Sequence, residues 1–178
     1  MRKNVNVFDY AETICKSIKK GVLLTTKLDD AVNTMTIGWG MLGIEWGKPI
    51  FIALVRESRY TKEYLDATGE FTVNIPISDI DNQILSICGT KSGREVDKIQ
   101  LLDLDLVESE VISVPGIRQL PLTLECKVIY RQTQDPAEIP AFAIERYYPK
   151  VNMELASGEE RDFHTAYYAE IVNAYLVE

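Results

Sequence analysis

Hydrophobic and polar residues alternate along much of this chain with the two-residue period of β-strands. Successive side chains of a strand lie on opposite faces, so alternation predicts one buried face and a short continuous apolar run predicts two. Six segments show one of these patterns and are predicted as strands: 21–28, 31–42, 48–55, 70–76, 120–132 and 163–178. The first two are joined by a predicted turn at Leu28-Asp29-Asp30. The pattern therefore predicts a mainly β protein.

Three other segments are predicted as helices, and two of them carry apolar residues every three or four positions, the period of an amphipathic helix. Each is followed by glycine, a common residue at helix C-termini. The predicted helices are 8–20, 61–68 and a stripe from Ile80 to Cys88. Asp9 is expected to cap the first, and Ser78 with Asp81 resembles a capping box for the third. Many strands with inserted helices predict a β-barrel decorated by helices.

Residues 132–162 are rich in proline, tyrosine and charged side chains and show no clear period. They predict a long loop with one helical turn, and the sequence assigns no role to it. No repeat, low-complexity tract or linker interrupts the chain. Its 178 residues fit one globular domain, and we predict a single domain over residues 1–178.

Charge and hydropathy narrow the classes of function. A formal net charge of −8 argues against a nucleic-acid partner, because such binding requires a broad basic surface. No apolar run approaches the roughly 20 residues of a membrane helix. The basic residues at the start are followed by no apolar segment, which argues against a secretion signal. We therefore expect a cytoplasmic protein without a membrane partner.

Cysteine and histidine are too sparse to predict a metal site. Cys15, Cys88 and Cys126 lie far apart, and His164 is the sole histidine. A zinc site requires about four such ligands at characteristic spacing, so we expect no metal. Reduced thiols are the expected state of the cysteines. Cys126 alternates with apolar residues on a predicted strand, so we expect it in the core.

Positive charge and hydroxyl groups are concentrated just before the second predicted helix, in "RESRYTK". Arg56 and Arg59 can each bind an anion through two N–H groups, and Ser58 and Thr61 can donate hydroxyl hydrogen bonds. The helix N-terminus adds its dipole and free N–H groups. This combination is typical of a phosphate site. The alternative is a solvated loop whose arginines pair with neighbouring glutamates, Glu57 and Glu63.

The preceding strand carries polar residues and glycines that suit a ligand. Its sequence "VNTMTIGWGMLG" contains Gly38 and Gly40, and glycine in a strand often marks the close approach of a ligand or another backbone. Trp39 and Trp46 are placed to flank a flat ring. The alternative is that both tryptophans belong to the core or to an interface.

These motifs together resemble the flavin reductase-like, FMN-binding split-barrel family, and especially its flavoredoxin-like branch. The matching blocks are "NTMTIGWG", "WGKP", "VRESRYT", "EFTVNIP", "CGTKSGREVDK" and "DFHTAYYAEIV", in this order over residues 33–172. The resemblance implies a six-stranded split barrel of Greek-key type. It also implies FMN as cofactor and a homodimer with the flavin near the subunit interface.

The resemblance also assigns site residues. It places Asn33, Met35, Thr36 and Gly38 at the ring or ribityl chain, Arg56, Ser58, Arg59 and Thr61 at the phosphate, and Ser92, Gly93, Arg94 and Lys98 in the lining of the same cleft. His164 falls where such reductases carry a histidine near the flavin face, at the approach of the nicotinamide. Its alternative reading is a buried, hydrogen-bonded structural residue.

The resemblance implies an NAD(P)H-dependent flavin reductase, in which hydride passes to flavin N5; NADH and NADPH are not distinguished. The alternative is a flavoredoxin-type electron carrier that exchanges electrons with a protein partner. An acidic surface would guide a basic partner. A third possibility is a structural or ligand-storage barrel without redox chemistry.

Overall fold

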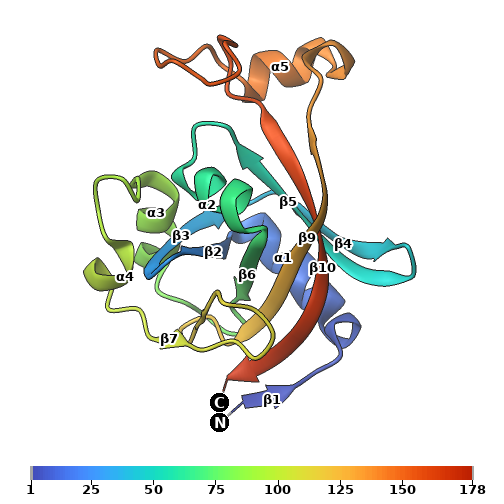
Figure 1. Cartoon of the computed structure of the whole chain (residues 1–178), viewed down its shortest axis with the longest axis vertical. Helices are drawn as coiled ribbons and strands as arrows, with labels where there is room; N and C mark the ends of the chain where they lie inside the picture. The colour runs from blue at the N-terminus through green and yellow to red at the C-terminus, as the bar shows by residue number, and fades with distance from the viewer. Residues whose placement is uncertain (1, 178) are drawn as a thin grey trace.

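The structure, a computed structural model, describes residues 2–177, and its main feature is one strongly curled antiparallel sheet (Figure 1). The strand order is β3-β2-β6-β9-β10-β5-β4, with β1 added beside β10. The strands are β1 (Arg2–Asn4), β2 (Val22–Leu28), β3 (Ala31–Ile37), β4 (Gly40–Glu45), β5 (Lys48–Arg56), β6 (Glu70–Ile75), β9 (Leu122–Thr133) and β10 (His164–Val177).

This sheet confirms the prediction of a mainly β protein and has eight strands, two more than the six expected. Since β1 pairs with β10, the sheet joins the first described strand to the last. The single-domain assignment over residues 1–178 stays a prediction. Among residues 2–177, no helix combines the length and the hydropathy needed to span a bilayer.

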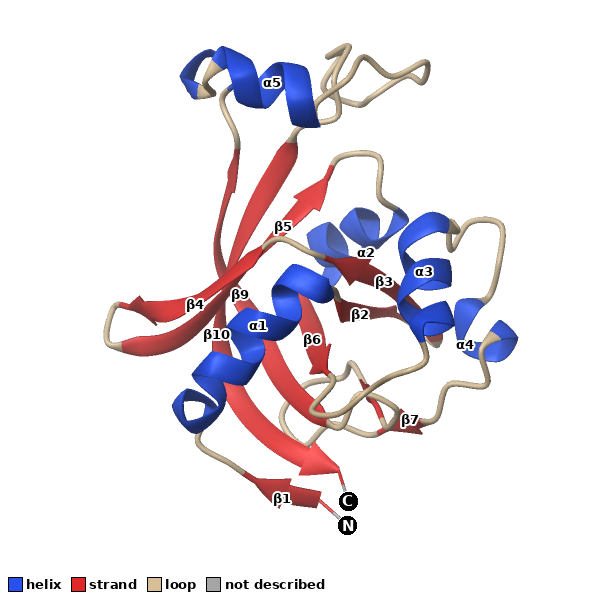
Figure 2. Ribbon diagram, turned by 180° about the vertical axis from the view of Figure 1, so that it is seen from behind, coloured by secondary structure: helices blue, strands red, loops and turns tan. Residues whose placement is uncertain are grey.

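The helices lie around the curled sheet rather than in a separate layer. They are η1 (Val7–Tyr10), α1 (Ala11–Lys20), α2 (Tyr60–Thr68), α3 (Asn82–Thr90), α4 (Lys98–Leu101), η2 (Pro136–Glu138) and α5 (Ala141–Tyr147). Two short strands, β7 (Leu106–Val107) and β8 (Gly116–Ile117), pair with each other. Figure 2 shows α1 across the concave side of the sheet, α2 and α3 near β2 and β3, and α5 projecting beyond the ends of β9 and β10.

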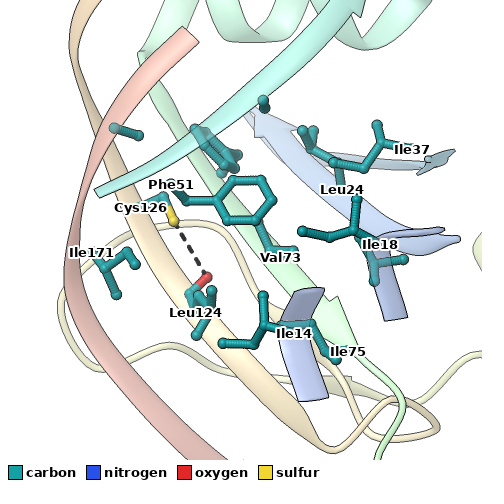
Figure 3. Close-up of a cluster of buried hydrophobic side chains, with 14 of the residues drawn as sticks. Ile14, Ile18, Leu24, Ile37, Phe51, Val73, Ile75, Leu124, Cys126 and Ile171 are labelled. Carbon is teal, nitrogen blue, oxygen red and sulfur yellow. Dashed lines mark hydrogen bonds between the residues drawn. The ribbon is translucent and has the colours of Figure 1, made fainter. Parts of the chain in front are cut away.

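The core fills the space between α1 and the sheet. Ile14 and Ile18 of α1 pack with Phe51 and Val73 from two different strands (Figure 3). Removing such side chains from water contributes about 1.5–3 kcal/mol each. Cys126 is fully buried in the same cluster, which confirms its predicted place in the core.

The predicted strand 31–42 is in fact two strands with different neighbours. β3 ends at Ile37 and pairs with β2, whereas β4 begins at Gly40 and pairs with β5. A Cβ on Gly40 would lie 2.9 Å from the Phe51 ring and 3.1 Å from the Ile52 carbonyl oxygen, so this position requires glycine. Gly38 and Trp39 form the break. An apolar pattern that continues across two glycines did not reveal it.

The first helix begins differently from the prediction. Asn6, not Asp9, is the cap, since its side chain accepts a hydrogen bond from the Phe8 N–H in front of η1. Asp9 lies inside that 3₁₀ turn, where its own N–H bonds to the Asn6 carbonyl oxygen. The α-helix then starts at Ala11.

The third predicted helix also begins and ends at other residues. Its N-cap is Asp81, whose carboxylate accepts a hydrogen bond of 2.9 Å from the Gln83 N–H, and Ser78 takes no part. The helix continues through Gly89 to Thr90, because Gly89 keeps helical geometry here. This extension carries the chain toward the cavities described below.

The segment 132–162 contains more regular structure than the predicted single turn. After β9 it forms η2 and the seven-residue helix α5 before returning to β10. None of the α5 residues is buried. A helix without a buried apolar stripe has no 3.6-residue hydrophobic period, so the sequence pattern could not reveal it.

Candidate functional site

Two adjoining cavities open between β3, the β5–α2 turn and the start of β10. The larger has a volume of about 330 Å³ and also borders the segment after α3. The smaller, of about 170 Å³, lies between the end of β3, Trp39 and β10. Met35 and Arg59 line both. Taken together, the two have the size of a small-molecule site.

All thirteen residues that the sequence assigned to the site line one or both cavities. Thr36, Gly38, Arg56 and His164 line the smaller, Asn33, Ser58, Thr61, Ser92, Gly93, Arg94 and Lys98 the larger, and Met35 and Arg59 both. Four segments far apart in the chain are thereby brought together. Their individual binding roles stay predictions.

The strand β3 offers its backbone to the cavities. It lies at the end of the sheet and pairs with β2 on one side only within residues 2–177. Such an end strand presents alternate N–H and C=O groups outward. This suits a strand that the resemblance places at the ring or ribityl chain of a flavin.

Arg59 occupies the position best suited to an anion. It is the N-cap residue of α2 and makes no side-chain capping hydrogen bond. Its guanidinium donates to the Gly89 carbonyl oxygen at the end of α3, at 3.2 Å, which holds it between the two cavities. No carboxylate within residues 2–177 forms an ion pair with Arg59 or with Arg56. Glu63 pairs instead with Arg94, and Glu57 bonds to Ser157, so the alternative in which the two arginines pair with these glutamates is wrong.

The predicted phosphate group of residues is divided by Asp162, which the sequence did not identify. Ser58 donates its hydroxyl to Asp162 Oδ2 at 2.6 Å and its N–H to Oδ1 at 2.9 Å. Arg56 donates to the carbonyl oxygens of Asp162 and Tyr147, at 3.2 and 2.7 Å. Arg56 thus lies beside the smaller cavity, apart from Thr61. Asp162 belongs to the aperiodic segment, and no local pattern linked it to Ser58.

Thr61 and Asn33 form a buried pair next to the larger cavity. Asn33 donates its side-chain N–H to the Thr61 hydroxyl oxygen at 2.8 Å, which leaves the hydroxyl hydrogen available to a ligand. A Cβ on Gly93 would lie 2.2 Å from Asn33 Oδ1. Glycine is therefore required at 93, because this loop must approach the Asn33 side chain closely.

Lys98 is the most unusual charged residue of the site. It is only 4% exposed, and its ammonium donates to the Lys91 carbonyl oxygen at 3.3 Å. Burial, with a contribution from Arg59, lowers its pKa, while Cys88 acts in the opposite direction. No carboxylate within residues 2–177 forms an ion pair with Lys98. Burial also raises the pKa of Cys88 to about 11, so this neighbour stays a neutral thiol.

His164 begins β10, directly across from Arg56. The imidazole is 5% exposed, and its centroid lies 4.8 Å from that of Trp39 in the wall of the smaller cavity. Burial, and then the charge of Arg56, lowers the His164 pKa to about 4, so the ring is neutral at pH 7. Trp46 lies instead at the tip of the β4–β5 hairpin, 69% exposed, and lines neither cavity of this chain, so its predicted place beside a ring stays a prediction.

The buried imidazole predicts a loss of stability on acidification. The unfolded chain binds a proton at His164 near pH 6.5, whereas the folded chain binds one only near pH 4. The contribution of His164 to the free energy of unfolding is therefore constant above pH 6.5. It falls, by about 3 kcal/mol in total, as the pH is lowered from 6.5 through 4. Urea unfolding of the wild type and of His164→Gln between pH 7 and 4 measures it. An equally steep loss in the variant would contradict the assignment.

Comparison with known proteins bears on the family and the fold of this chain. The family pattern described as a flavin reductase like domain matches residues 16–178. An uncharacterized protein of Archaeoglobus fulgidus is 32% identical over 97 residues, which cover 54% of each chain. The matched part thus spans about half the length of the curated relatives.

Two solved structures resemble the fold over most of the chain. An FMN-binding domain of a flavin reductases-like enzyme from Shewanella baltica has a TM-score of 0.68 at 16% identity, covering 99% of this chain and 77% of its own. A flavoredoxin from Methanosarcina acetivorans has a TM-score of 0.62 at 25% identity, covering 89% and 68%. They confirm the predicted split-barrel fold. The chain belongs to the flavin reductase-like family.

Proposed function

We propose that this chain binds FMN across the two adjoining cavities and acts as an NAD(P)H-dependent flavin reductase. The observation that carries the proposal is the larger cavity's charge. Arg59 and Lys98 line it without a carboxylate partner among the described residues, in a chain of net charge −8. A phosphate carries about −1.5 to −2 charges and accepts several hydrogen bonds, so it would supply the missing counter-charge.

The smaller cavity suits the ring end of the same ligand. It is lined by Met35, Gly38, Trp39 and the neutral His164, so it combines apolar surface with a few polar groups. FMN, when bound, supplies the redox chemistry by accepting a hydride. The protein's part is to anchor the phosphate at Arg59, to offer the outer backbone of β3 to the ring, and to keep His164 uncharged where a nicotinamide would approach.

A second function is supported by the surface charge and by one neighbour. A net charge of −8 would steer the protein toward a basic redox partner. The flavoredoxin from Methanosarcina acetivorans is 25% identical to this chain. A flavoredoxin-type carrier would use the same FMN site but would receive its electrons from a protein rather than from NAD(P)H.

An anaerobic titration distinguishes the two functions. The FMN-loaded protein is mixed with NADH or NADPH, and the visible absorbance of the flavin is followed, with protein-free FMN as the control. Rapid bleaching supports the reductase, and the more effective nucleotide identifies the donor. Bleaching only by a reduced redox protein supports the carrier. A protein that takes up no FMN would refute both.

We also propose a homodimer with FMN near the interface and a cytoplasmic location. Large apolar side chains on the β4–β5 hairpin and on α5 support the dimer, since Ile44, Trp46 and Phe142 are each about 70% exposed. Sedimentation as a 20.2 kDa species would contradict the dimer.

The three free cysteines support the cytoplasmic location, because they suit a reducing compartment. Recovery of the native protein outside the cytoplasm after cell fractionation would contradict that location.

A further inference from the structure

His164 belongs to a chain of hydrogen bonds that the proposed reaction does not by itself explain. Its Nδ1 lies 2.9 Å from the Tyr148 hydroxyl oxygen, which in turn lies 2.8 Å from Gln134 Oε1. Gln134 follows β9, Tyr148 caps the end of α5, and His164 begins β10. The Gln134 N–H also donates to the His164 carbonyl oxygen at 3.0 Å. The start of the 132–162 segment and the end of α5 are thereby tied to the histidine.

Tyr148 is held firmly in this chain. It is 3% exposed, with the Phe163 ring 4.9 Å away and the Arg56 guanidinium 5.3 Å above its own ring. Its phenol has a single hydrogen, so it can donate to one of its two neighbours only. Gln134 Oε1 is a carbonyl oxygen and accepts only. The phenol must therefore donate to Gln134 and accept from His164, which places the imidazole hydrogen on Nδ1.

The charges around the imidazole are compatible with this arrangement. With its hydrogen on Nδ1, the ring keeps a lone pair on Nε2, for which no protein donor exists within residues 2–177. Arg56 and Arg59 line the same cavity as the ring, and the Asp162 carboxylate is engaged by Ser58. The charges of Arg56 and Arg59 disfavour a second proton on the ring, so one ring nitrogen keeps its lone pair.

We propose that Tyr148 is a positioning residue that, with Gln134, holds His164 as the Nδ1–H tautomer and so presents a hydrogen-bond acceptor, Nε2, to the smaller cavity. The ligand group that meets the histidine must then bring an N–H donor. This ligand assignment rests on the proposed function: the carboxamide of a nicotinamide carries such a donor, and a carboxylate in its place does not.

The tautomer can be measured directly, because the chain has one histidine. Long-range ¹H–¹⁵N correlation spectra of ¹⁵N-histidine-labelled protein at pH 7, without FMN, should show a protonated Nδ1 and an unprotonated Nε2. Tyr148→Phe should move the hydrogen to Nε2 in most molecules, because the phenol acceptor is lost. A wild type with protonated Nε2, or a Tyr148→Phe spectrum like the wild type, would overturn the proposal.

Two further variants keep the test decisive if Tyr148→Phe disturbs the fold. Gln134→Leu leaves the phenol in place but removes its acceptor, so the phenol should turn to donate to Nδ1 and the hydrogen should again move to Nε2. Tyr130→Phe removes a 45% exposed phenol from the same sheet and should leave the spectrum unchanged. An unchanged spectrum in Gln134→Leu would contradict the proposed hydrogen-bond chain from His164 through Tyr148 to Gln134.

A ligand experiment tests the hydrogen-bond chain through Tyr148 and the proposed function independently of each other. In FMN-loaded wild type, nicotinamide should shift the Nε2 resonance, whereas nicotinic acid should not, and Tyr148→Phe should lose this preference while retaining FMN. If the spectra show the predicted tautomers but nicotinamide causes no shift, the hydrogen-bond chain through Tyr148 is retained. Its assigned ligand and the reaction with NAD(P)H are then refuted. Equal shifts with both compounds would refute the acceptor assignment alone.

Discussion

Arg59→Ala should weaken the binding of FMN about tenfold to a hundredfold and leave the binding of riboflavin nearly unchanged. The two ligands share the ring and the ribityl chain and differ in the phosphate. Losing one hydrogen bond between charged groups costs about 1.5–3 kcal/mol, which corresponds to this range of affinity. Arg59 has no ion-pair partner within residues 2–177, so its charge is available to the ligand.

Arg94→Ala is the matched comparison for this prediction. Arg94 lines the same cavity, but its guanidinium pairs with Glu63 and donates to the Ser58 carbonyl oxygen at 3.2 Å. Its charge is already largely neutralised, so its removal should reduce FMN affinity less than Arg59→Ala does. Arg118→Ala, remote from the cavities and half-exposed, should have no effect. Fluorescence titrations with both flavins measure all three, and equal losses for FMN and riboflavin in Arg59→Ala would refute the phosphate site.

Lys98→Met should change stability and binding in opposite directions. The lysine holds an ammonium group in a nearly buried position with a single 3.3 Å hydrogen bond, and burial lowers its pKa. Methionine fills similar space without a charge, so the ligand-free protein should gain on the order of 1 kcal/mol or more. The same change removes a phosphate partner and should reduce FMN affinity by about tenfold or more.

Lys91→Met provides the control for Lys98→Met. Lys91 lines the same cavity but is exposed, so its ammonium is already solvated. Its replacement should leave the stability of the ligand-free protein unchanged and weaken FMN binding only slightly, through the loss of a screened charge. Thermal unfolding with and without FMN measures both quantities. A Lys98→Met protein that is less stable without ligand would show that the lysine supports the fold rather than the ligand.

The predicted strands and helices rest on local patterns and were largely recovered in the structure. The alternation in 120–132 became β9, and the turn at Leu28-Asp29-Asp30 became the β2–β3 connection. The predicted strands and helices were wrong where the apolar pattern continued across two strands or where no such pattern existed. Residues 31–42 kept an apolar pattern across two strands, and α5 has no buried face to produce one.

The candidate site likewise contains residues that the local sequence could identify and residues that it could not. The types of residue at 56–61 and 88–98 indicated an anion site, because guanidinium groups, hydroxyls and a helix N-terminus favour phosphate wherever they occur together. Asp162 and Tyr148 could not be found in this way. Each is an ordinary polar residue of an aperiodic segment, and its role depends on a partner about a hundred residues away or on another element.

The amino-acid sequence alone determined the strand pattern, the concentration of cations in an acidic chain, and the motifs that point to FMN, because these are properties of neighbouring residues. Only the tertiary structure decided that Arg56 lies beside His164, and that Arg59 and Lys98 line a cavity without an ion-pair partner among residues 2–177. It also decided that Trp39 borders the smaller cavity while Trp46 lines neither. Burial and hydrogen-bond partners depend on how distant segments pack, and no local pattern encodes that packing.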